Sequence, residues 1–156
     1  MERFGSARDY FESVRDAAIE LDRTGRTLER MRASMGPKSQ RYDRPGGRGG
    51  TCDPTRRADD IVDYEAIVRG RVESDGELIA DAGRVLYGED GRAGVALGMG
   101  PAYADAVYRR ACDALTWDGV ARALFVSRGK ARQLYDAAID YVDAAGLDGA
   151  AAGVGI

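Results

Sequence analysis

A long stripe of apolar residues near the N-terminus is the feature that most restricts the fold of this chain. Its members follow one another at alternating spacings of four and three: Tyr10, Val14, Ala17, Leu21, Thr24, Leu28, Met31 and Met35. This spacing places them along one side of an α-helix, as in a coiled coil or a helical hairpin. We therefore predict one helix over residues 6–35, with Ser6 and Asp9 capping its start. Gly25 weakens it by about 1 kcal/mol relative to Ala.

A second helix is predicted over residues 59–87, after a segment that helices cannot cross. Residues 36–58 contain Pro37, Pro45, Pro54 and five glycines, with six basic and two acidic residues. We expect a flexible, cationic loop there, able to add contacts to phosphate. The second helix has its own apolar face: Ile61, Tyr64, Val68, Val72, Leu78, Ile79, Ala82 and Leu86. The two helices are predicted to form an antiparallel hairpin.

The remaining sequence predicts shorter helices and a loose end. Glycines punctuate residues 88–105, so we expect a short helix over 90–98 and another that restarts at Pro101 and ends near Ala114. The C-terminal residues show no periodicity, and we expect the chain to fray beyond Gly146. The predicted fold is all-α, with a helical hairpin (1–87), a DNA-binding region (88–145) and a flexible tail (146–156).

Composition excludes several classes of function. The chain has no histidine, so it lacks the commonest general base and the commonest metal ligand. Cys52 and Cys112 alone cannot complete a four-ligand zinc site, and we interpret both as reduced, with Cys112 a small buried residue. The segment GGRGGT lacks the Lys-Ser/Thr ending of a phosphate-binding loop. We therefore predict no enzyme activity, no metal and no cofactor.

The start of the chain and its hydropathy bear on localisation. MERFGSARDYFESV is charged from its second residue and has no apolar core of a signal peptide. No stretch reaches the eighteen apolar residues of a membrane span. These patterns predict a cytoplasmic protein without a membrane partner.

Residues 116–144 carry the pattern most informative about function. Thr116 is a good helix N-cap, and Ser127 is a second one only eleven residues later. Between them a short apolar face ends near Leu124, and Ala121 supplies the small side chain that two crossing helices need. Two short helices joined by a tight turn form a helix-turn-helix, whose second helix enters the DNA major groove N-terminus first.

The charges of this segment fit the same interpretation. Although the chain has a net charge of −3, four cationic and no acidic residues lie between positions 122 and 133. Arg128, Arg132 and Gln133 have side chains that can pair with guanine or adenine edges. Arg122 and Lys130 are better suited to phosphate, and Gly129 removes bulk at the closest approach. The acidic residues further along, Asp136, Asp140 and Asp143, are expected to face away from DNA.

The stretch LTWDGVARALFVSRGKARQLYDAA resembles the fourth conserved region of sigma factors. The longer arrangement is similar to the phage-type ArpU and RinA regulators, with the tighter part covering about residues 103–142. The resemblance implies regulation of phage or mobile-element genes. The residues it assigns to DNA recognition or to positioning the two helices are Thr116, Trp117, Ala121, Ser127, Arg128, Lys130, Arg132 and Gln133.

One departure is Phe125, which stands where such turns usually place Gly because the residue needs a positive φ; with Phe, the position is strained or the turn differs.

The sequence leaves the binding partner open between two hypotheses. The main hypothesis is a regulator that binds double-stranded DNA through residues 101–144 and forms a homodimer or partner contact through its N-terminal helices. The alternative is an interaction module that docks on RNA polymerase or another regulator without reading DNA. In that case the acid-rich helix 59–87 is the working surface, since residues 59–90 hold ten acidic and three basic side chains.

Overall fold

The computed structural model describes residues 4–34 and 54–154, and all regular structure within these ranges is helical. The all-α prediction is therefore confirmed for the described residues. The helices in chain order are α1 (Ala7–Ala33), α2 (Pro54–Tyr87), α3 (Gly94–Gly98), α4 (Pro101–Ala111), α5 (Trp117–Ala123) and α6 (Arg128–Ala152). None of the helices in these ranges is long and apolar enough to cross a membrane.

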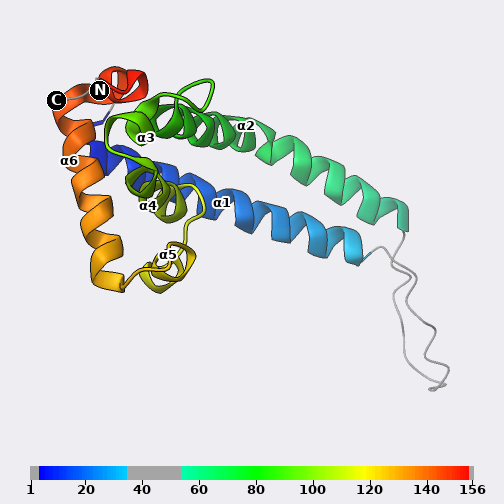
Figure 1. Ribbon diagram of the computed structural model, residues 1–156. Coiled ribbons are helices and arrows are strands. Elements are labelled where there is room, and N and C mark those ends of the chain that lie inside the picture. The colour runs from blue at the N-terminus through cyan, green and yellow to red at the C-terminus, as the bar shows by residue number, and fades with distance from the viewer. Residues whose placement is uncertain (1–3, 35–53, 155–156) are drawn as a thin grey trace.

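Helices α1 and α2 lie side by side and run in opposite directions (Figure 1). The predicted cap is confirmed, since the Ser6 hydroxyl accepts a hydrogen bond from the Asp9 N–H at 3.1 Å. The predicted apolar stripe of α1 is turned inward: Tyr10, Val14, Ala17 and Thr24 are buried, and Leu21, Leu28 and Met31 are half-buried. Met35 lies outside the described residues.

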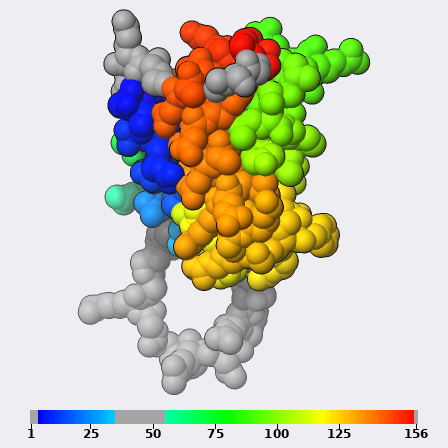
Figure 2. Space-filling view, turned by 60° about the vertical axis from the view of Figure 1, so that its left-hand side comes forward, coloured from blue at the N-terminus to red at the C-terminus, as the bar shows by residue number. Residues whose placement is uncertain are grey.

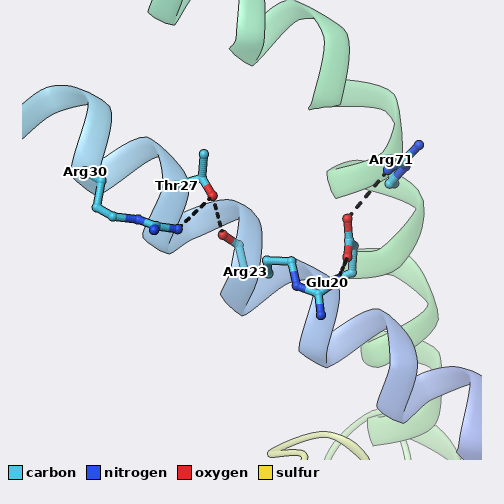
Figure 3. A network of polar contacts seen from close by, with 5 residues as sticks. All are labelled: Glu20, Arg23, Thr27, Arg30 and Arg71. Carbon is cyan, nitrogen blue, oxygen red and sulfur yellow. Dashed lines mark hydrogen bonds and ion pairs between the residues drawn. The ribbon is translucent and has the colours of Figure 1, made fainter.

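Ion pairs between exposed side chains join α1 to α2 along their length. Arg32 pairs with Glu65 at 2.6 Å. Arg71 pairs with Glu20 at 3.5 Å (Figure 3). Exposed pairs of this kind contribute about 0–1 kcal/mol each. They therefore favour one register of the two helices, while the apolar stripe supplies most of the stability.

Three predicted boundaries differ from the structure. Helix α2 begins at Pro54 and not at residue 59, because proline is well accepted in the first turn of a helix. Helix α3 begins at Gly94 and not at residue 90, because the chain turns through glycines at positive φ before it. Helix α4 ends at Ala111, three residues early, and Ala114 then has a φ of 51°. The rest of the predicted cationic loop, residues 36–53, lies outside the described residues.

The C-terminal segment is more ordered than its sequence predicts. We expected fraying beyond Gly146, but the chain only kinks there (φ 74°, ψ 162°) and stays helical to Ala152. Ala150 is fully buried, and the Tyr141 hydroxyl donates a hydrogen bond to the Val154 carbonyl at 2.7 Å. The prediction was wrong because tertiary contacts, which leave no periodic signal, hold this end against the rest of the molecule.

A single main core joins segments that are distant in the sequence. Its fully buried members come from five helices, and the largest include Phe11, Leu86, Val95, Val107 and Ile139. Helix α6 lies in the middle of one face, between the first turns of α1 and the α2–α3 region (Figure 2). Residues of the predicted hairpin and of the predicted DNA-binding region thus share one core, so α1 and α2 support the position of α6.

Two glycines should respond oppositely to alanine. Gly94 has a φ of +73°, and a Cβ there would lie 2.5 Å from the Leu86 carbonyl carbon, whereas Gly25 lies within α1 with open space around it. We expect Gly94→Ala to lower the free energy of unfolding by about 2–4 kcal/mol through strain and overpacking. Gly25→Ala should raise it by about 0.5–1 kcal/mol. Chemical denaturation tests both, and effects of the same sign would contradict the backbone described.

Candidate nucleic-acid interface

Helix α5 begins and packs as its residue types predict. The Thr116 hydroxyl accepts a hydrogen bond from the Gly119 N–H at 3.2 Å, which confirms Thr116 as an N-cap. Val120 and Ala121 are buried and form a small second core with Ala131 of α6. The small side chain of Ala121, as expected, lies where α5 and α6 meet.

The turn between α5 and α6 spans residues 124–127 and is held by the backbone. The Val126 N–H donates to the Ala121 carbonyl at 3.0 Å, and the Ser127 hydroxyl accepts from the Lys130 N–H at 3.2 Å. Ser127 is therefore the second predicted N-cap, now confirmed. Phe125 has a φ of 55°, so the turn does need a left-handed residue and Phe adopts this conformation under strain.

The first turns of α6, residues 127–133, are called here its leading end. Arg128, Lys130 and Gln133 are all exposed there, and so is Arg122 near the end of α5. Arg128 approaches one carboxylate, that of Asp118, at 3.8 Å, and both side chains are largely solvated. Within the described ranges, Lys130 and Arg122 have no carboxylate within ion-pair distance. These cations are free to meet an external anion.

Arg132 differs from the other predicted reading residues because it is engaged. Its guanidinium lies over the Trp117 ring, 5.4 Å from the centroid, and the guanidinium of Arg110 lies 4.7 Å from the same ring. Trp117 also meets Tyr135 edge to face at 5.4 Å. The half-buried Trp117 thus joins α4, α5 and α6, and Arg132 is held beside α5 although its side chain is still exposed.

The carboxylates beyond the leading end are used inside the molecule. Asp136 pairs with Arg8 at 2.8 Å, and Asp143 accepts a hydrogen bond from the Ala7 N–H at 2.6 Å. The second contact places a negative charge at the N-terminus of α1, where the helix dipole favours it. Helix α6 therefore divides into a cationic leading end and a later part that anchors α1. Asp140 is exposed.

The sequence pattern did not predict a cluster of arginines beside α5. A cavity of about 230 Å³ between α1 and helices α4–α6 is lined by Arg8, Arg15, Arg110, Glu12, Asp16, Phe11, Trp117 and Tyr135. Among the described residues, the Nε of Arg15 is buried without a hydrogen-bond partner. Burial and the nearby charge of Arg15 lower the pKa of Arg110. No pattern links these positions, because α1 and α4 are distant in sequence and meet only through folding.

Cys112 caps the C-terminal end of α4 and is not a reactive group. Its thiol is free and half-buried at the edge of the main core, slightly less enclosed than predicted. Burial raises the pKa of the Cys112 thiol to about 12, so it stays protonated at neutral pH and is a poor nucleophile. Cys52 lies outside the described residues.

Comparison with known proteins found no matching family model, no matching curated protein and no matching solved structure.

Proposed function

We propose that this chain is a sequence-specific DNA-binding regulator of phage or mobile-element genes, in which α5, the turn and α6 act as a sigma region 4-like helix-turn-helix. The observation that carries the proposal is the charge at the leading end of α6. Its first turn holds no acidic residue and instead holds Arg128 and Lys130, exposed and directly after the Ser127 cap. Helix N-termini favour negative side chains, so cations here oppose local stability and suit an external polyanion.

The proposed mechanism assigns a role to each side chain of this surface. Arg128 and Gln133 enter the major groove, where they can pair with guanine and adenine edges respectively. Lys130 and Arg122 contact phosphates on either side and fix the register on the duplex. Arg132 is assigned to the phosphate backbone as well, since its stacking on Trp117 holds it beside α5. Thr116, Trp117 and Ser127 position the two helices, and the Ser127 cap also presents helix N–H groups to phosphate.

A second candidate function is docking on RNA polymerase or another regulator. It is favoured by two exposed apolar side chains of α2, Val62 (63%) and Ile67 (79%), which lie among many carboxylates. Exposed apolar residues rimmed by charge are typical of protein contact sites. Helix α2 is also available for a homodimer contact in the proposed regulator.

Selection from random-sequence duplexes tests the proposed function. We expect the full chain to enrich a defined site, and binding to that site to weaken linearly with salt on a log–log scale. Replacing Lys130 or Arg122 by Ala should reduce this slope by about one each, because each phosphate contact releases counterions. Binding of Arg128→Ala should lose preference at the base pair that Arg128 reads, while the preference supplied by Gln133 stays.

The outcome that rejects the proposal is equally specific. If the chain enriches no sequence and binds no duplex even at low salt, it is not a DNA-binding regulator. Capture of purified RNA polymerase by the same preparation, lost in a Val62→Asp plus Ile67→Asp variant, would then support the docking function.

A further inference from the structure

Phe125 is unfavourable for the isolated protein in two independent ways. Its side chain is 96% exposed, the largest exposure among the strongly exposed apolar side chains of the described residues. Its backbone also has a φ of 55°, a conformation that Gly adopts freely and a bulky residue does not. Glycine would remove both penalties, and strain of this kind is kept mainly where function requires the side chain.

Packing within the chain does not explain the residue. Phe125 belongs to neither hydrophobic cluster, although its neighbours Leu124 and Val126 do pack against α5 and α6. Its backbone N–H donates to the Arg122 carbonyl at 3.3 Å, a contact that any residue except proline can make. The fold therefore needs a left-handed residue at position 125 but has no use for the aromatic ring.

The surroundings of the ring indicate the kind of partner. Arg122 lies three residues before it, and Arg128 and Lys130 follow within five, all exposed. The other strongly exposed large apolar residues in the described ranges, Val62, Ile67, Leu97 and Val154, are on other parts of the fold. A stable protein interface needs about 800 Å² from each partner with an apolar centre, which one ring among cations does not provide. A polyanion that also carries small apolar groups does match one exposed ring among exposed cations.

We propose that the Phe125 ring contacts the apolar surface of bound duplex DNA, at a thymine methyl group or a deoxyribose. This inference rests on the proposed function. Duplex DNA offers thymine methyl groups in the major groove, beside the phosphates assigned to Arg122 and Lys130. A side chain two residues before the Ser127 cap lies next to the groove when the leading end enters it. Phe125 then adds affinity that the charges alone do not supply.

The Phe125→Gly variant tests the inference, with Ala114→Gly as its matched control. Ala114 is the other non-glycine residue at positive φ in the described chain (51°), and it precedes α5, outside the leading end. Both substitutions relieve the same strain, so each Tm should be unchanged or raised by up to about 4 °C. Affinity for the selected duplex should fall about tenfold for Phe125→Gly and stay at the wild-type value for Ala114→Gly.

Replacing thymine by uracil in the duplex distinguishes the two apolar contacts. If the ring touches a methyl group, uracil weakens wild-type binding and leaves Phe125→Gly unaffected; if it touches deoxyribose, uracil changes neither. Wild-type affinity in Phe125→Gly overturns this inference alone and leaves the proposed function intact. Absence of duplex binding by the wild type removes both.

Discussion

A chain carrying Arg128→Glu and Lys130→Glu is expected to bind duplex DNA at least about 100-fold more weakly than the wild type. The two exposed cations stand at the leading end of α6, where we propose one base contact and one phosphate contact. Single contacts of these kinds are worth about 1–3 kcal/mol. Reversal of charge adds repulsion between each carboxylate and the phosphates, so the combined loss exceeds that of alanine substitution.

The same double variant should be as stable as the wild type or more so. Ser127 is the N-cap, so Glu at position 130 completes a capping box and Glu at position 128 meets the positive end of the helix dipole. The one ion pair lost, Arg128 with Asp118 at 3.8 Å, is exposed and contributes little. We expect the free energy of unfolding to rise by about 0.3–1 kcal/mol. Loss of binding with a gain in stability separates recognition from folding.

Fluorescence anisotropy with the selected duplex, together with thermal unfolding, measures both effects. The matched control is Arg69→Glu with Arg92→Glu, which changes net charge equally at two exposed positions on and just after α2. The affinity of this control for the duplex should fall only slightly, because a more negative protein is repelled by DNA in general. Equal losses in the two double variants would mean that net charge, and not the leading end of α6, governs binding.

Local signals in the sequence located most of the candidate site. Thr116 and Ser127 cap helices because a hydroxyl placed before an apolar run satisfies free backbone N–H groups nearby. The departure at Phe125 marked a position where the backbone geometry is demanding, and its φ of 55° shows the strain. Such features depend on a few consecutive residues, which is why they could be predicted without knowing the fold.

Contacts between distant segments could not be predicted in the same way. Arg132 was assigned to a reading face, but Trp117 holds its guanidinium through a packing arrangement that also needs Arg110 of α4. The hydrogen bond from the Ala7 N–H to Asp143 links the start of α1 to α6, two segments far apart in the sequence. The helical end after Gly146 depends on neighbours such as Leu97 and Gly94, which lie against Gly153. None of these pairings has a periodic or compositional signature.

Phe11→Ala is expected to cause the largest loss of stability of any single substitution considered. The Phe11 side chain is fully buried, meets Tyr10 edge to face at 5.0 Å, and belongs to the core shared by α1, α4 and α6. Truncating a buried Phe to Ala costs about 3–5 kcal/mol. Since domains of this size unfold with about 5–15 kcal/mol in total, the variant should lose at least about a fifth of its stability. Its Tm should fall by roughly 10–15 °C.

Phe125→Ala is the control, because it is chemically the same substitution at a solvated ring. It removes no packing and leaves the left-handed backbone unchanged, so the free energy of unfolding should stay within about 0.5 kcal/mol of the wild type. Urea denaturation of both variants gives the comparison directly. Equal costs at the two positions would mean that α1 does not contribute its first turns to the core. The expected difference, in contrast, places Phe11 among the residues that hold α6 in position, and Phe125 among those that the fold itself does not need.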